Sequence, residues 1–170
     1  MGNLAFNSSI YGPQTQAHVL HYGESIEVLV YSDNLNDHSL HMHMGEYQVV
    51  EVGPYGDAVA NNRPAVAFQR SGSAPMRSDV VTIRSFSYIK LRFRVNHGAI
   101  IFFHCHMIHN FKGLAVTFIA APDLLQKHMK VPNEVIRMCK LQNIKTSGNA
   151  AGNAGFDLTG LPQPLLVNHG

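Results

Sequence analysis

The segment Ile89–Val95 alternates apolar and basic residues without interruption, as Ile-Lys-Leu-Arg-Phe-Arg-Val. Successive side chains of a strand point to opposite faces, so this pattern predicts a strand with one buried face and one solvated face. Comparable short runs continue as far as Ala120 and are separated by turns that contain Gly and Pro. We expect further strands at 25–31, 40–52, 65–69, 79–84, 99–105 and 114–120. Many short strands joined by such turns indicate an all-β sandwich or barrel.

The pattern changes after Pro122. Residues Asp123–His128 and Pro132–Gln142 have helical patterns, and from Ser147 the composition turns to Gly, Asn, Ala and Pro. A chain of 170 residues has the length of one domain, with room for a short appendage. We therefore expect one β domain over residues 1–122, followed by short helices and a tail over 123–170.

Charge and hydropathy exclude several classes of partner. The 13 Lys and Arg residues nearly balance the 11 Asp and Glu residues, and no basic run is long enough to bind phosphates, so we expect no nucleic acid partner. The longest apolar stretch, Ala99–Phe103, is far shorter than the roughly 20 residues that cross a bilayer. The sequence begins Met1-Gly2-Asn3-Leu4, without the charged and apolar regions of a secretory signal. We expect neither a signal peptide nor a transmembrane segment in these residues.

Histidine is the most informative residue type. The chain has 11 histidines and no tryptophan, and six of the histidines fall in two dense clusters. The first cluster is His38, His41 and His43, and the second is His104, His106 and His109. Imidazole is the commonest metal ligand in proteins, so two such clusters predict a metal site.

The segment His104-Cys105-His106 can serve two metal sites. On a strand, both histidines point to one face and Cys105 points to the other. A thiolate with two imidazoles and a weak or absent axial ligand is the arrangement of blue-copper sites that transfer electrons. The residues that could supply it are Cys105, His38 and His109.

The segments His38–His43 and His104–His109 resemble the paired copper motifs in the last domain of multicopper oxidases. The similarity extends to residues 9–13, 74–81 and 113–122. Residues 135–153 look like the C-terminal end of fungal iron-transport ferroxidases, which favours that branch over laccases. The resemblance implies a plastocyanin-like (cupredoxin) Greek-key β-sandwich with a short helical C-terminal extension, corresponding to the third domain of such an oxidase.

The resemblance also implies a role for each motif residue. Cys105, His38 and His109 would bind the mononuclear blue copper, and Leu114 falls at the axial position, where it offers no donor atom. The remaining histidines would supply half of a trinuclear copper cluster: His104, His106 and His43 for the coupled copper pair, and His41 for the third copper. During catalysis, electrons would pass from Cys105 through its covalent neighbours His104 and His106.

The chain departs from the family pattern at several positions. His109 follows Cys105 one residue earlier than in the family, so the copper-binding loop is shortened by one residue. Iron-oxidising members place a carboxylate just before the first histidine, where it receives Fe²⁺. Asp33 and Asp37 are candidates for this role, while Asn34 stands at the family's spacing. A solvated turn rich in Asp and Asn is the alternative interpretation of this segment.

The family builds its trinuclear cluster between two domains, which contribute half of the histidines each. The chain has only one such half, so we expect a C-terminal fragment or a truncated product that needs the missing N-terminal cupredoxin domains or another cupredoxin chain. Cys139 resembles a family cysteine with a structural role.

The activity that the resemblance implies is that of a ferroxidase. Such an enzyme oxidises Fe²⁺ and reduces O₂ to water in high-affinity iron uptake, outside the cell at the plasma membrane and beside an iron permease. A laccase-like oxidase of phenols is one alternative. A stand-alone blue-copper protein, which carries electrons or holds copper without reducing oxygen, is another, and a remnant that binds no metal is a third.

Overall fold

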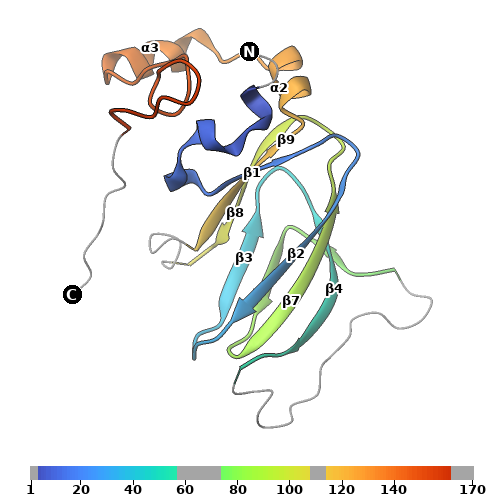
Figure 1. The fold of residues 1–170 in the computed structure, drawn as a ribbon. Coiled ribbons are helices and arrows are strands. Elements are labelled where there is room, and N and C mark those ends of the chain that lie inside the picture. Colours follow the sequence, from blue (N-terminus) through green and yellow to red (C-terminus); the bar gives the residue numbers. More distant parts are fainter. Residues whose placement is uncertain (1–3, 57–73, 108–113, 162–170) are drawn as a thin grey trace. The chain divides into compact units, whose positions relative to one another are not determined.

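The computed structural model describes residues 4–56, 74–107 and 114–161 (Figure 1). The chain forms two compact units. The sandwich unit comprises residues 23–95 and 101–115, and the terminal unit comprises residues 1–22, 96–100 and 116–170. Both units are discontinuous in sequence because the chain passes between them more than once.

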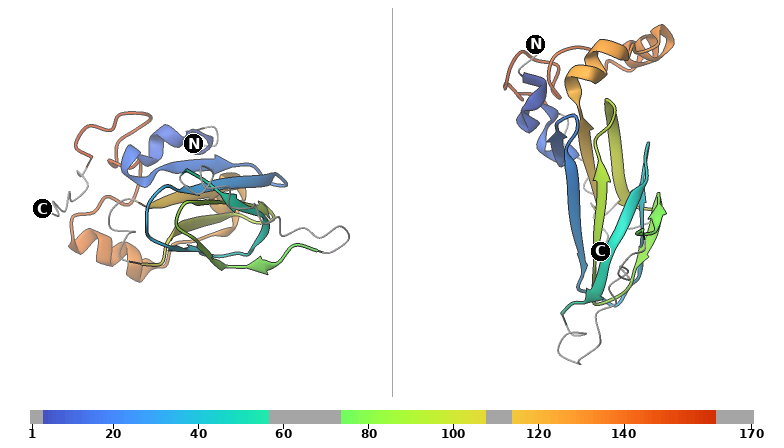
Figure 2. Two further views of the ribbon diagram at one scale, coloured as in Figure 1. Left: turned by 90° about the horizontal axis from the view of Figure 1, so that it is seen from below. Right: turned by 90° about the vertical axis from the view of Figure 1, so that its right-hand side faces the viewer.

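The sandwich unit has two layers of antiparallel strands (Figure 2). One sheet has the order β2-β7-β4-β5, with β2 at Ser25–Ser32, β7 at Ser87–Arg94, β4 at Tyr47–Pro54 and β5 at Arg77–Ser78. In the other layer β3 (His38–Met42) pairs with β6 (Val80–Ile83) on one side and with β8 (Ala99–Cys105) on the other. The predicted all-β sandwich is therefore confirmed.

Strand β7 shows the alternation that the sequence predicts. Ile89, Leu91 and Phe93 are buried, with 1%, 1% and 9% of their surfaces exposed. The intervening Lys90 and Arg92 form ion pairs with carboxylates of the neighbouring strands. Each large apolar side chain buried in this way stabilises the fold by roughly 1.5–3 kcal/mol. The strands predicted at 25–31, 79–84, 99–105 and 114–120 are also present, and the one predicted at 65–69 lies outside the described residues.

The single strand predicted over residues 40–52 is wrong, because two strands in different sheets occupy this range. β3 ends at Met42, and β4 begins at Tyr47. Met44 between them has a φ of 59°, which is left-handed and incompatible with a continuous strand. The chain turns at His43 and Met44. The hydrophobic pattern continues across the turn and conceals it.

The terminal unit contains a parallel strand pair and the helices. β1 (Ala17–Leu20) runs parallel to β9 (Ala115–Ala120), with Ala17 opposite Thr117. Three short 3₁₀ helices precede β1, at Leu4–Phe6, Ser8–Tyr11 and Pro13–Thr15. The sequence did not predict β1 or these 3₁₀ helices, because β1 has only four residues and the helices contain little periodic pattern.

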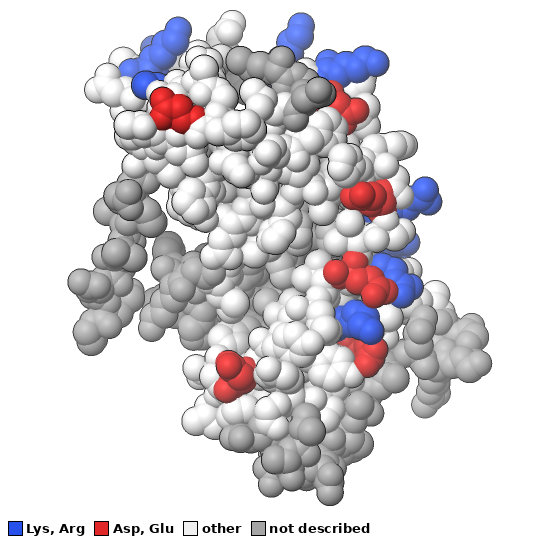
Figure 3. Space-filling model, in the orientation of Figure 1, with Lys and Arg blue, Asp and Glu red and all other residues white. Residues whose placement is uncertain are grey.

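Two α-helices follow β9, close to their predicted bounds. α2 spans Pro122–His128 and begins with proline, while α3 spans Asn133–Leu141. The tail folds back through Ala150, whose N–H donates to the carbonyl of Ile10 over 2.8 Å. None of the helices in the described ranges is long and apolar enough to cross a membrane. Figure 3 shows acidic and basic side chains lying beside one another along one edge of the visible face.

Tyr47 links the two layers of the sandwich unit. Only 1% of its surface is exposed, and its hydroxyl donates to the carbonyl of Leu40 on β3 over 2.9 Å. Burial raises the pKa of Tyr47, and the charge of Asp79 raises it further, so the hydroxyl keeps its proton and remains a donor. Since Leu40 lies between His38 and His41, this bond fixes the position of the strand that carries the first histidine cluster.

Replacing Tyr47 with Phe removes this bond and keeps the ring. We expect Tyr47→Phe to lower the free energy of unfolding by about 1–2 kcal/mol, the usual cost of losing a buried hydrogen bond. Urea unfolding followed by circular dichroism measures the effect. Tyr22→Phe is the matched control, because Tyr22 is 62% exposed and its replacement should change stability by less than about 0.5 kcal/mol. Equal unfolding midpoints for both variants would contradict the proposed link.

Candidate metal centre

The register between β3 and β8 brings the two histidine clusters together. Leu40 pairs with Cys105, and His41 pairs with His104. Paired residues of antiparallel strands point to the same face, so these two pairs lie on opposite faces of the layer. The predicted separation of Cys105 from its histidine neighbours is therefore present in the fold.

A buried thiol and imidazole form the first part of the site. Cys105 is completely buried and His38 is 7% exposed. The Sγ atom of Cys105 lies 3.8 Å from Nδ1 of His38. A soft thiolate beside an imidazole is the donor chemistry that suits copper, so these two residues fit the group that the motifs predict.

The loop before β3 sets the orientation of the His38 ring. The side-chain oxygen of Asn34 accepts the backbone N–H of Asn36 over 2.9 Å, which identifies it as the acceptor end of the amide. His38 Nε2 lies 3.3 Å from the same oxygen and must therefore donate its proton to it. The lone pair of neutral His38 is then on Nδ1, the nitrogen that faces Cys105.

A hollow of about 240 Å³ opens beside His38. It is lined by residues of β2, the loop after it, β3, β6 and the segment before β9: Val30, Tyr31, Ser32, Asp33, Asn34, His38, Leu40, Ile83 and Leu114. The carbonyl of Leu114 accepts the N–H of Cys105 over 3.0 Å, so Leu114 lies directly beside the cysteine. The side chain of Leu114 offers this region no donor atom.

Four histidines gather on the opposite face of the layer. The ring centroids of His41 lie 5.0 Å from His43, 5.7 Å from His104 and 5.4 Å from His106. His104 also lies 5.1 Å from His43 and 5.6 Å from His106. We call these residues the four-histidine group. Its members come from both sequence clusters, as the motifs predict.

Backbone carbonyls fix the tautomers of two of these rings. Nδ1 of His41 donates to the carbonyl of Asp79 over 3.0 Å, and Nδ1 of His104 donates to the carbonyl of Cys105 over 3.0 Å. Each bond places the lone pair on Nε2, the usual arrangement for a metal-binding histidine. Nε2 of His104 lies 3.1 Å from Nε2 of His43, so in the metal-free chain His43 donates its proton here.

The surroundings of His43 keep its ring neutral. Desolvation by the atoms around its ring lowers the pKa of His43, and the neighbouring rings of His104, His41 and His106 lower it further. Only a neutral imidazole can bind a metal, so the environment favours the form of His43 that can act as a ligand.

The structure assigns different surroundings to the two candidate carboxylates. Asp33 lines the hollow beside His38. The side chain of Asp37 instead accepts the backbone N–H of Ser85 over 2.8 Å, which stabilises the turn after β6.

One predicted ligand cannot be placed, because His109 lies outside the described residues. Within the described ranges, no three His, Cys, Asp or Glu residues are arranged so that they could together hold a metal ion.

Asp79 is the partner that sequence reasoning missed. It belongs to the segment 74–81 that resembles the family, but nothing in its pattern shows that its carbonyl faces His41.

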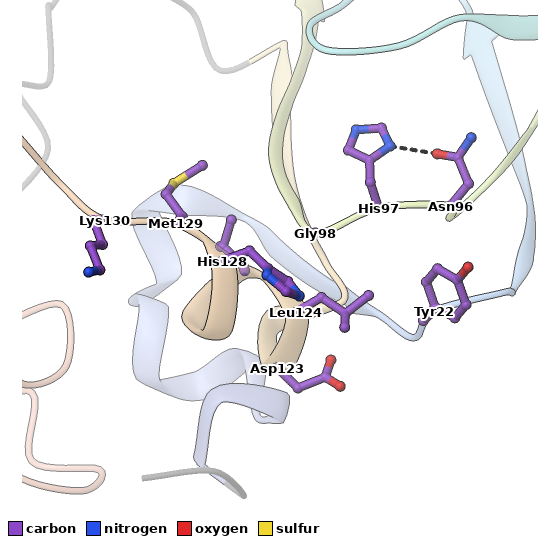
Figure 4. Close-up of a pocket in the computed structure, with 10 residues that line it drawn as sticks. Tyr22, Asn96, His97, Gly98, Asp123, Leu124, His128, Met129 and Lys130 are labelled. Carbon is purple, nitrogen blue, oxygen red and sulfur yellow. Dashed lines mark hydrogen bonds between the residues drawn. The ribbon is translucent and has the colours of Figure 1, made fainter.

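A larger hollow, of about 800 Å³, lies in the terminal unit (Figure 4). His97 and His128 both line it, and Nδ1 of His97 lies 2.5 Å from the side-chain oxygen of Asn96. No residue that the motifs predict as a ligand belongs to this hollow, so we do not assign the metal centre to it.

Comparison with known proteins agrees with the motifs. The sequence model of the multicopper oxidase family matches residues 1–124. The chain is 38% identical to the iron multicopper oxidase fer1 of Mycosarcoma maydis, over 100% of this chain and 28% of that protein. It is 33% identical to the iron transport multicopper oxidase FET5 of Saccharomyces cerevisiae, over 95% of this chain and 28% of that protein.

The fold comparison gives the same assignment. The crystal structure of Fet3p, a multicopper oxidase that functions in iron import, superposes with a TM-score of 0.75 at 26% identity, covering 95% of this chain and 31% of Fet3p. The laccase from Botrytis aclada shares the fold, with a TM-score of 0.53 at 18% identity over 79% of this chain and 25% of the laccase. This chain therefore spans less than a third of the curated relatives that it matches, and it belongs to the multicopper oxidase family.

Proposed function

We propose that this chain is the copper-binding C-terminal cupredoxin domain of a ferroxidase, which oxidises Fe²⁺ and reduces O₂ to water in iron uptake. Residues 1–122 would form that domain and 123–170 its helical extension. The observation that carries the proposal is the placement of a buried thiol–imidazole pair and a four-histidine group on opposite faces of the same paired strands. The relatives named for iron transport favour iron over phenols as the reductant.

Three residues would hold the mononuclear copper: Cys105, His38 and His109. When bound, copper supplies a one-electron acceptor at this position. Cys105 provides the thiolate, while Asn34 holds His38 in the tautomer whose Nδ1 faces the sulfur. Leu114 lines the same hollow and would offer the copper no donor atom.

The four-histidine group would hold half of the trinuclear cluster. His104 and His106 flank Cys105 in sequence, so a covalent path of three residues joins the two donor sets and gives the electron a short route. The remaining ligands would come from preceding cupredoxin domains or from another cupredoxin chain.

Asp33 is the residue that we infer receives Fe²⁺. It lines the hollow that His38 also lines, and a carboxylate oxygen is a hard ligand that favours the Fe³⁺ product. Asp37 is the weaker candidate of the two, because its carboxylate already accepts a backbone N–H from the turn after β6. By the same family relation, the complete protein would act outside the cell or at the plasma membrane, with an iron permease as its partner.

Two other functions use the same residues. A laccase-like oxidase would accept phenols at the hollow beside His38. A stand-alone blue-copper protein would bind one copper per chain and transfer electrons without reducing oxygen. Anaerobic reduction by Fe²⁺ and by a phenol, compared on the same copper-loaded chain, distinguishes the iron from the phenol function. Oxygen consumption by this chain together with a matching cupredoxin partner distinguishes the oxidase from the stand-alone protein.

Loading the chain with Cu²⁺ tests the mononuclear site. We expect an intense visible charge-transfer band from the thiolate to copper, at about one such site per chain. Cys105→Ser should abolish the band, whereas Cys139→Ser should retain it, because Cys139 lies on α3 in the terminal unit. A chain that shows no band after loading, or a Cys105→Ser variant that keeps it, would contradict the proposed site.

Stopped-flow mixing of the copper-loaded chain with Fe²⁺, without oxygen, tests the iron assignment. We expect Asp33→Asn to slow the bleaching of the band about tenfold, which corresponds to roughly 1.4 kcal/mol of lost transition-state stabilisation. Asp37→Asn should instead lower the thermal stability with a smaller effect on the bleaching rate, because it weakens the turn at Ser85. Unchanged bleaching in Asp33→Asn would contradict the assignment.

A further inference from the structure

Three tyrosines lie together on the outer face of the β2-β7-β4-β5 sheet. Tyr31 on β2 and Tyr88 on β7 are paired residues of the ladder, with ring centroids 6.3 Å apart. Tyr55, directly after β4, lies 4.5 Å from Tyr31. Tyr31 and Tyr55 are 51% and 38% exposed, so the group reaches solvent. We call these residues the tyrosine trio.

Tyr88 is the member with a proton acceptor. Its hydroxyl donates to Oε1 of Glu51, and the other oxygen of the same carboxylate accepts from Nζ of Lys90 over 3.0 Å. The hydrogen bond from Tyr88 lowers the pKa of Glu51, and Lys90 lowers it further. The same bond raises the pKa of Tyr88. At neutral pH the pair is therefore an intact phenol beside an ionised carboxylate.

The fold holds the Tyr88 ring in place. A Cβ atom at Gly53, opposite Tyr88 in the ladder, would come within 2.5 Å of this ring, so the ring occupies the space that the missing side chain leaves. An aromatic ring over a strand glycine is a stabilising cross-strand arrangement, and it leaves Tyr88 little freedom to move away from Glu51.

The trio also borders the hollow of the metal centre. Tyr31 lines that hollow together with His38 and Leu114. Tyr31 therefore belongs both to the trio and to the lining of this hollow. Neither the proposed iron oxidation nor the copper ligands account for the trio.

We propose that Tyr31, Tyr55 and Tyr88, with Glu51 as proton acceptor, form a site of one-electron oxidation. A high-potential one-electron oxidant takes one electron from the Tyr88 phenol, and the phenolic proton moves along the hydrogen bond to Glu51. The products are a neutral tyrosyl radical, a protonated Glu51 and the reduced oxidant. Return of one electron, with the proton from Glu51, restores the starting state.

The position of Tyr31 gives this site a protective use. The oxidant is a diffusible high-potential radical in solution, so the proposal does not depend on copper at the Cys105–His38 pair. The trio would carry the oxidising equivalent from Tyr88 to the exposed rings of Tyr31 and Tyr55, where a reductant in solution can remove it.

The experiment uses the metal-free chain, so its failure is independent of any failure to bind copper. A photogenerated ruthenium(III) tris-bipyridyl complex serves as the oxidant, and electron paramagnetic resonance of rapidly frozen samples measures the phenoxyl radical. We expect Tyr88→Phe to lose most of the signal and to keep the fold, because the phenylalanine ring still covers Gly53. Circular dichroism checks the fold.

Two further variants decide the interpretation. Glu51→Gln should also lose most of the signal, because an amide oxygen accepts a hydrogen bond but is too weak a base to take the proton. Tyr22→Phe should retain the signal, although Tyr22, at 62% exposed, is more accessible than any member of the trio. If Tyr22→Phe loses as much signal as Tyr88→Phe, exposure alone decides which tyrosine is oxidised and the proposal is wrong.

Prolonged oxidation gives a second readout that does not depend on a variant. When Tyr31 and Tyr55 each lose one electron and one proton, their ring carbons can couple in a covalent bond across the 4.5 Å that separates the centroids. Mass spectrometry after proteolysis should find a dityrosine link between the peptides that carry these two residues. Links that occur only between separate chains would overturn the proposed movement of the radical within the trio.

Discussion

The candidate metal centre depends on the pairing register of β3 with β8. This register places Leu40 opposite Cys105 and His41 opposite His104. A slip of one residue would move every side chain of β3 to the other face, separating Cys105 from His38 and breaking up the four-histidine group. Tyr47 opposes such a slip, because it holds the carbonyl of Leu40 from the other layer. The turn at Met44 leads the chain from β3 to the layer that contains Tyr47, so this turn also helps to position the site.

Hydrogen bonds outside the predicted ligands complete the site. Asn34 and the carbonyls of Asp79 and Cys105 each fix one ring, so His38 presents Nδ1 while His41 and His104 present Nε2. The two faces of the layer therefore use opposite nitrogens of the same residue type. This difference follows from where the acceptor lies, and under the proposed function it would let adjacent residues of β8 serve two chemically different centres.

Sequence reasoning predicted the sandwich and the separation of Cys105 from His104 and His106 through strand periodicity, and the grouping of the four histidines through the resemblance to the copper motifs. It failed at residues 40–52, where an apolar pattern continues through a turn whose cause is the backbone angle of Met44. It could not find the partners of the rings, since the carbonyl of Asp79 meets His41 from the bend between β5 and β6, 38 residues away. It also left Asp33 and Asp37 equivalent, and only the fold shows that Asp37 stabilises a turn while Asp33 lines the hollow. The sequence shows which residue occupies each motif position, but tertiary contacts decide how the side chain of that residue is oriented.

The two halves of the centre differ in how much the chain supplies by itself. The thiol–imidazole pair is enclosed by the sandwich unit, where Cys105 and His38 are almost completely buried. The four-histidine group instead includes exposed rings at His43 and His106, and its shared proton lies between two nitrogens that would both be ligands in a metal-bound state. Within the described residues this group does not hold a metal ion by itself, so further ligands would have to complete the site. The buried half can therefore be tested in this chain alone, whereas under the proposed function the exposed half would acquire its chemistry only with a partner domain.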